Sequence, residues 1–137
     1  MKTRAKTVLI VEDSLTQVLN LKQLLEEQGL QLLWAHNGQM AVLMAQQYMP
    51  DVILLDVEMP EMNGFEACKR LKENTRTAEI PTVMLTKLDD PASALRGMNL
   101  GAIDFIPKDA FSNTVLLETL RQLQIIDKTN GGYNVTL

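Results

Sequence analysis

Short apolar runs alternate with longer amphipathic stretches along this chain, and this alternation constrains the fold more than any other feature of the sequence. Three runs are unbroken, at residues 8–11, 52–55 and 83–85. Apolar runs of this length are typical of strands that are covered on both faces. Weaker strand candidates lie at 31–36 and 103–106. The sequence therefore predicts five short strands.

A helical pattern follows each predicted strand. In residues 15–28, apolar side chains recur every three or four positions. Ser14 and Gln17 form a capping-box signature in front of this stretch, and Gly29 supplies a stop after it. The other helices are expected at about 38–48, 65–73, 91–101 and 113–124.

Strand and helix thus alternate five times, which predicts a doubly wound α/β fold. Such a fold has a parallel sheet, helices on both of its faces and right-handed crossovers. The length of 137 residues fits one domain. We expect this domain to occupy residues 1–126, and we expect the polar residues 127–137 to form a flexible C-terminal tail.

Charge and cysteine content exclude several classes of protein. The net charge of −4 lacks the basic excess of nucleic-acid-binding proteins. The single cysteine excludes an internal disulfide framework and fits a reducing compartment. No apolar run approaches the roughly 20 residues that span a bilayer. We therefore expect a cytoplasmic protein with no membrane insertion and no nucleic-acid partner.

Side chains with useful chemistry follow four of the predicted strands. Glu12 and Asp13 come after the first strand, and Asp56 comes after the third. Thr86 follows the fourth strand, and Lys108 follows the fifth. In open α/β sheets, ligands bind in the crevice outside the carboxyl ends of the strands. We therefore expect three acids, a hydroxyl and an amine on one rim of the sheet.

The charges of this group suggest a chemistry. Three ionised carboxylates in one crevice repel one another, and we expect this repulsion to raise their pKa values. A Mg²⁺ ion, which prefers oxygen ligands and keeps several waters, would balance the charge together with Lys108. A carboxylate can attack phosphorus and form an acyl phosphate, a transfer that needs mainly positioning and charge neutralisation. Asp56 is the candidate phosphoacceptor, and Thr86 and Lys108 are candidate phosphate-binding residues.

Four segments together resemble the response-regulator receiver domain of the CheY type. They are VLIVEDS at the first strand, DVILLDVEMPEMNGFE around Asp56, TVMLT ending in Thr86, and GAIDFIPKD containing Lys108. They occur in the order that is usual for the family and lie within residues 6–126. The resemblance implies a flavodoxin-like (βα)5 three-layer sandwich with strand order 2-1-3-4-5.

The resemblance also implies roles for the acidic residues. Asp56 would take a phosphoryl group from the phosphohistidine of a histidine kinase. Asp13 and Asp56 would bind Mg²⁺ directly, together with the backbone carbonyl of Glu58. Glu12, at a position that is often aspartate in the family, would act through water.

A switch follows from the same resemblance. The phosphate adds a charge of about −1.5 to −2, which can bias a loop with two states. Thr86 would move toward the phosphoryl group, and Phe105 would turn inward. The surface of the fourth helix, fifth strand and fifth helix would then change its affinity for a downstream target protein. Pro60 and Gly64 are expected to shape the loop after Asp56.

The sequence departs from the family pattern at the end of the fifth strand. Receivers usually have Lys followed by Pro there, often with a cis peptide bond. Here Pro107 precedes Lys108, and Asp109 follows it. Pro107 removes an amide donor, which is tolerable at the end of an edge strand. A cis peptide without proline costs about 2.5 to 4 kcal/mol, so we predict a trans Lys108–Asp109 bond.

The leading hypothesis is a stand-alone response regulator, a switch that acts by protein binding and is not an enzyme in its own right. A phosphorylation-independent pseudo-receiver scaffold stays open as an alternative. An aspartate-nucleophile phosphatase is disfavoured because Asp56-Val57-Glu58 lacks a second aspartate. A flavodoxin-like electron carrier is disfavoured because the first loop has no glycine to hold a flavin phosphate.

The kinase, target and pathway are not identified by the sequence. Chemosensory or motility signalling and a phosphorelay both fit, and a homodimer that forms on phosphorylation stays open. Cys68 lies on an apolar helical stripe, which favours a place in the core. Trp34 lies on the second predicted strand, two strands from Asp56, and is therefore expected to be a poor fluorescence probe of phosphorylation.

Overall fold

The central sheet has five parallel strands in the order β2-β1-β3-β4-β5, as the sequence predicts. The structure is a computed structural model that describes residues 5–127. The predicted tail falls almost wholly on residues 128–137, which lie outside the described residues. The strands are β1 (Thr7–Val11), β2 (Gln31–Ala35), β3 (Val52–Leu55), β4 (Thr82–Thr86) and β5 (Asp104–Pro107).

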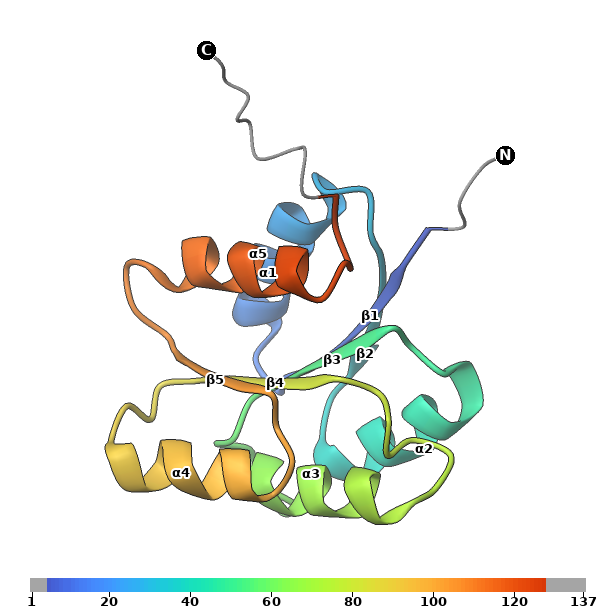
Figure 1. Cartoon of the computed structure of the whole chain (residues 1–137), viewed down its shortest axis with the longest axis vertical. Helices are drawn as coiled ribbons and strands as arrows, with labels where there is room; N and C mark the ends of the chain where they lie inside the picture. The colour runs from blue at the N-terminus through green and yellow to red at the C-terminus, as the bar shows by residue number, and fades with distance from the viewer. Residues whose placement is uncertain (1–4, 128–137) are drawn as a thin grey trace.

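Five helices cover the two faces of this sheet. In Figure 1, α1 and α5 lie on one side, and α2, α3 and α4 lie on the other. The helices are α1 (Leu15–Glu26), α2 (Gly38–Tyr48), α3 (Gly64–Glu73), α4 (Pro91–Asn99) and α5 (Ser112–Gln122). The predicted doubly wound α/β fold is therefore confirmed.

Predicted and observed boundaries differ by at most about two residues. The first helix ends at Glu26 and not at residue 28 because the following residues form a tighter turn. In that turn the N–H of Gln28 donates to the carbonyl of Leu25, and Gly29 adopts a φ of 80°. Glycine tolerates this left-handed conformation, which is why it can end the helix.

The last strand lies one residue later than predicted and includes Pro107. β5 is an edge strand that pairs only with β4, and Pro107 lies opposite Thr86 at the end of this pairing. An edge position has no need of the amide donor that proline lacks. None of the described peptide bonds is cis, so the trans Lys108–Asp109 bond is confirmed.

The hydrophobic core is divided into two layers by the sheet. Alternate strand residues point to opposite faces, so Leu9 and Ile53 pack under α2, α3 and α4, while Ile10 and Leu54 pack under α1 and α5. Cys68 belongs to the first layer and is fully buried, as predicted. Each large side chain buried in this way contributes about 1.5–3 kcal/mol relative to exposure.

Because helices cover both faces, functional groups that must meet a ligand have to lie at the ends of the strands. The loops that follow β1, β3, β4 and β5 meet at the carboxyl end of the sheet. No helix in residues 5–127 is long and apolar enough to cross a membrane.

Candidate functional site

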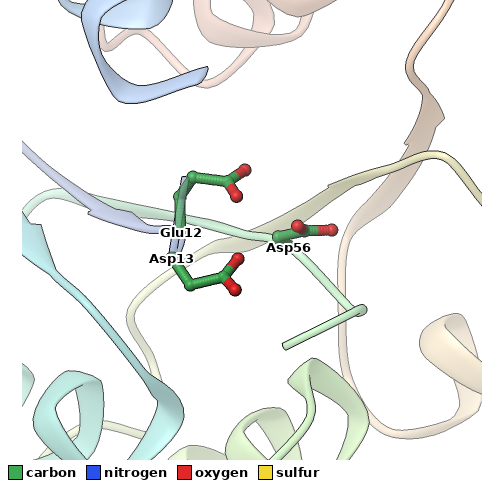
Figure 2. A group of neighbouring side chains, drawn as sticks. All are labelled: Glu12, Asp13 and Asp56. Carbon is green, nitrogen blue, oxygen red and sulfur yellow. The ribbon is translucent and has the colours of Figure 1, made fainter. Parts of the chain in front are cut away.

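Three carboxylates meet at the carboxyl end of the sheet. Glu12 and Asp13 directly follow β1, and Asp56 directly follows β3. β1 and β3 are neighbours whose last residues, Val11 and Leu55, pair in register. The next residues of the two strands therefore lie side by side. Figure 2 shows Glu12 and Asp13 extending toward Asp56, and one oxygen from each of the three lies within 4.8 Å of the others.

The three acids differ in exposure. Glu12 is 3% exposed and Asp56 is 7% exposed, whereas Asp13 is open to solvent. The site therefore has a buried inner part formed by Glu12 and Asp56. Asp13 forms its outer edge, where a ligand can approach from solvent.

Lys108 brings a positive charge to this cluster from the end of the edge strand β5. Its Nζ lies 2.8 Å from Oε1 of Glu12 and 3.6 Å from Oδ2 of Asp56. β4 separates β5 from β3, so the long lysine side chain spans the width of a strand. The backbone N–H of Lys108 donates to the carbonyl of Thr86 at 2.7 Å, which holds the base of the side chain beside β4.

The Glu12 carboxylate is held by both of its oxygens. Oε1 accepts a hydrogen bond from Lys108, and Oε2 accepts one from the backbone N–H of Ser14 at 3.2 Å. In the predicted capping box that N–H would be bonded by the side chain of Gln17. In the structure the Ser14 N–H instead donates to the carboxylate of Glu12, whose charge makes it a stronger acceptor than a glutamine amide. Only the other half of the box forms, from the Gln17 N–H to Oγ of Ser14 at 3.4 Å.

Burial raises the pKa of the Glu12 carboxyl above its ordinary value. The nearby charge of Asp56 acts in the same direction, while the hydrogen bond and charge of Lys108 act against it. The expected repulsion between acids therefore contributes at Glu12, but loss of solvent is the larger cause.

The loop after Asp56 folds back onto it. Oδ1 of Asp56 accepts the backbone N–H of Glu58 at 3.3 Å, and the N–H of Gly64 donates to the carbonyl of Val57 at 2.9 Å. A Cβ on Gly64 would overlap the carbonyl oxygen of Asp56 and lie 2.7 Å from Cα of Val57. Only glycine allows this close approach, which supports the predicted loop-shaping role. Pro60 lies exposed in the same loop.

A pocket of about 180 Å³ lies in front of the acids. It has room for several water molecules. It is lined by Glu12, Asp13, Ser14, Gln17, Asp56, Glu58, Lys87 and Lys108. Carboxylate oxygens and space for retained waters fit the coordination preferences of Mg²⁺.

Thr86 and Phe105 lie outside this pocket. Thr86 is fully buried, and its Oγ1 accepts the backbone N–H of Leu88 at 3.3 Å. Phe105 is half-buried and packs against the core layer under α4, where its ring lies close to Gly97. The structure therefore brings together the acids and Lys108, but it does not bring the Thr86 hydroxyl into contact with them.

Two residues near the site were missed by the sequence reasoning. Lys87 lines the pocket and directly follows Thr86, so the rule that selected strand ends could have found it. Trp34 lies on β2, and its indole N–H donates to the backbone carbonyl of Glu12 at 2.7 Å. No local pattern indicates that bond, because it joins residues that are 22 positions apart.

The family model for the response regulator receiver domain matches residues 8–121, which contain the whole acid cluster and Lys108. This chain belongs to the response-regulator receiver family. Receiver domains generally act as phosphoacceptor switches in two-component signalling and use Mg²⁺ at an acidic pocket. They take phosphate from histidine kinases and act on downstream targets.

Receivers from several bacteria resemble this chain. Protein PilH of Pseudomonas aeruginosa is 38% identical over 109 residues, which cover 80% of this chain and 90% of PilH. Response regulator PleD of Caulobacter vibrioides is 36% identical over 116 residues, which cover 85% of this chain but only 25% of PleD. Receivers thus occur nearly alone in some relatives and as one part of larger proteins in others.

Solved structures confirm the CheY-like fold. Chemotaxis protein CheY4 of Vibrio cholerae superposes with a TM-score of 0.80 at 32% identity, over 88% of this chain and 99% of CheY4. The receiver domain of a histidine kinase from Syntrophus aciditrophicus gives a TM-score of 0.80 at 40% identity, over 97% of this chain and 98% of that domain.

Proposed function

We propose that this receiver accepts a phosphoryl group from a histidine kinase on Asp56, in a reaction that depends on Mg²⁺. One observation carries the proposal. The Asp56 carboxylate lies beside two further carboxylates and 3.6 Å from the Lys108 ammonium, at the edge of a pocket of about 180 Å³. A nucleophile, a cation site and a fixed positive charge are the groups that phosphoryl transfer needs.

The transfer forms one bond and breaks another. An oxygen of Asp56 attacks the phosphorus, and the phosphorus–nitrogen bond of the donor phosphohistidine breaks with its electron pair moving to the imidazole. The product is an aspartyl phosphate at residue 56. Lys108 then holds a phosphoryl oxygen, which requires it to exchange part of its contact with Glu12.

Asp13, Asp56 and the backbone carbonyl of Glu58 would hold Mg²⁺ directly, and Glu12 would act through water. When bound, the ion neutralises charge on the phosphoryl oxygens. The exposure of Asp13 and the place of Glu58 in the pocket lining support this assignment.

Phosphorylation would change the surface formed by α4, β5 and α5. Thr86 would release the N–H of Leu88 and contact the phosphoryl group, and Phe105 would turn inward. This surface carries exposed apolar side chains that a downstream protein can bury: Leu95, Met98, Ile103, Phe111 and Val115. Exposed apolar side chains are typical of binding surfaces where they form a patch.

We further propose that the output is protein binding by a receiver spanning residues 1–126, in chemosensory or motility signalling or in a phosphorelay. The 38% identity to PilH, 90% of which is covered by the match, supports output through the receiver itself. Likeness to the chemotaxis protein CheY4 supports the chemosensory assignment.

Intact mass spectrometry tests the proposed function. We expect acetyl phosphate to add one phosphate to the full chain in the presence of MgCl₂, and far less when EDTA replaces it. Asp56→Asn should remove the adduct. Asp89→Asn, which neutralises an exposed acid of the loop after β4, should leave it unchanged. A parent protein of unchanged mass would overturn the proposal, and rapid turnover of phosphate esters would favour a phosphatase.

A further inference from the structure

Both backbone polar groups of Glu12, its N–H and its carbonyl, form hydrogen bonds with residues of β2. Its N–H donates to the carbonyl of Ala35 at 3.1 Å, and its carbonyl accepts the indole N–H of Trp34 at 2.7 Å. The first bond extends the pairing of β1 with β2 by one residue. The second comes from a side chain, and its length is at the short end of the range for N–H···O bonds.

The bond from Trp34 also constrains the next residue. The carbonyl of Glu12 and the N–H of Asp13 belong to one planar peptide unit. Fixing the carbonyl fixes this plane and therefore the positions of the Asp13 nitrogen and Cα, from which its side chain leaves the backbone. The Asp13 carboxylate makes no hydrogen bond or ion pair with any other residue in 5–127, so no neighbouring side chain holds it and the placement of its backbone matters more.

We propose that Trp34 is a positioning residue for the magnesium site. Its indole N–H holds the Glu12–Asp13 peptide so that the Asp13 carboxylate faces Asp56. This proposal rests on the Mg²⁺-dependent function proposed above and adds a residue from β2 to that site. Trp34 acts through the backbone and does not touch the ion or the phosphoryl group.

The indole ring is itself well placed for this task. Trp34 pairs with Ile10 on β1, and its ring stacks on that of His36 with centroids 4.2 Å apart and planes 11° from parallel. The stack and the strand restrict the ring, so its N–H points steadily at the Glu12 carbonyl. A phenylalanine could keep the stack, but it has no N–H to donate.

Two matched variants separate the hydrogen bond from the stack. Trp34→Phe removes the N–H and keeps a ring, whereas His36→Gln removes the stack and keeps the N–H. For each full-length variant, the rate of phosphorylation by acetyl phosphate is measured against MgCl₂ concentration. The MgCl₂ dependence of thermal unfolding gives a second estimate of the midpoint without phosphorylation.

We expect Trp34→Phe to raise the MgCl₂ concentration at half-maximal rate about fivefold, the effect of losing one hydrogen bond. The maximal rate at saturating MgCl₂ should stay within about twofold of the parent. A merely structural role would lower the maximal rate or the folded fraction without moving this midpoint. His36→Gln should move the midpoint less than about twofold. An unchanged midpoint in Trp34→Phe, or an equal rise in His36→Gln, would overturn the proposal.

Fluorescence tests the same link in the unaltered protein. Trp34 is the single tryptophan of the chain, so all tryptophan emission comes from it. Although β2 lies two strands from Asp56, the Trp34 indole bonds to the Glu12 carbonyl beside the acids. We therefore expect MgCl₂ to change this emission with the midpoint found for phosphorylation, and Asp13→Asn to abolish the change. Emission that stays constant while MgCl₂ raises the unfolding temperature would overturn the positioning role alone. If MgCl₂ changes none of the three quantities (tryptophan emission, unfolding temperature and phosphorylation rate), the proposed function fails as well.

Discussion

Glu12 shows how much of the site depends on single atoms. One carboxylate oxygen holds Lys108, the other holds the Ser14 amide, and the backbone carbonyl accepts the Trp34 indole. The sequence indicated that an acid at this position would face the pocket, because it directly follows a strand. It did not indicate which oxygen binds which donor, since these contacts depend on rotamers and on residues from three other segments.

Gly64 gives a prediction at the scale of one residue. Gly64→Ala places a methyl group against the backbone of Asp56 and Val57, which cannot yield without moving the loop. We expect the free energy of unfolding, measured with urea, to fall by about 1–3 kcal/mol, as for other overpacked sites. Phosphorylation of Asp56 should fall as well, because the same loop positions its carboxylate.

Glu66→Ala is the matched control for this substitution. Glu66 lies in the first turn of the same helix, is exposed and pairs only with exposed Arg70 in the described structure. We expect a loss of about 0.5 kcal/mol or less. Equal stability of Gly64→Ala and the parent would contradict the close approach of this loop to Asp56.

The strands and helices themselves follow closely from the sequence. Unbroken apolar runs predict the buried strands, and the three- and four-residue periodicity predicts the helices, because burial on one or both faces imposes these patterns. The start of α5 is less predictable. It follows a turn in which Asp109 accepts the N–H groups of Phe111 and Ser112, and no apolar periodicity marks such a turn.

Strand ends also explain which parts of the site are predictable. The order of parallel strands brings Glu12, Asp56 and Lys108 to one edge whatever their rotamers. The expectation that functional residues follow the carboxyl ends of the strands therefore identified all three. The same expectation included Thr86, yet the Thr86 hydroxyl accepts a hydrogen bond from the backbone N–H of Leu88 in this structure. The strand order fixes where a residue lies, but local hydrogen bonds decide where its side chain points.

Helix α3 provides a pH-dependent prediction. The thiol of Cys68 is buried against the carbonyl of Leu100, and burial raises its pKa above the ordinary value. Above about pH 8.5 the unfolded chain loses this proton while the folded chain keeps it. The folded state then binds more protons, so its stability must fall as pH rises. The slope is at most about 1.4 kcal/mol per pH unit.

Cys68→Ala isolates this effect. We expect the variant to be less stable than the parent at pH 7 because it leaves a small cavity, but this difference should narrow above about pH 8.5. Burial lowers the pKa of nearby Lys72, which affects both proteins and largely cancels in the comparison. Urea unfolding across this pH range provides the measurement, and a constant difference would contradict the role of the buried thiol.

At the scale of the whole molecule, β5 connects the pocket with the proposed output surface, because Lys108 directly follows it and the strand forms part of that surface. Thr86 ends β4 next to the site, and Met84 of the same strand pairs with Phe105 on β5. The ring of Phe105 lies against α4, close to Gly97. Met84, Phe105 and Gly97 thus pack together between β4 and α4, and the proposed switch would act through these contacts.

The proposed function depends most on which carboxylate receives the phosphate. Borohydride reduces an aspartyl phosphate to homoserine and releases the phosphate, so the modified residue can be identified in peptides by mass spectrometry. After treatment with acetyl phosphate and MgCl₂ followed by borohydride, we predict homoserine at position 56, with Glu12 and Asp13 unmodified. Reduction at Glu12 or Asp13, or no reduced residue at all, would contradict the assignment of Asp56 as the phosphoacceptor.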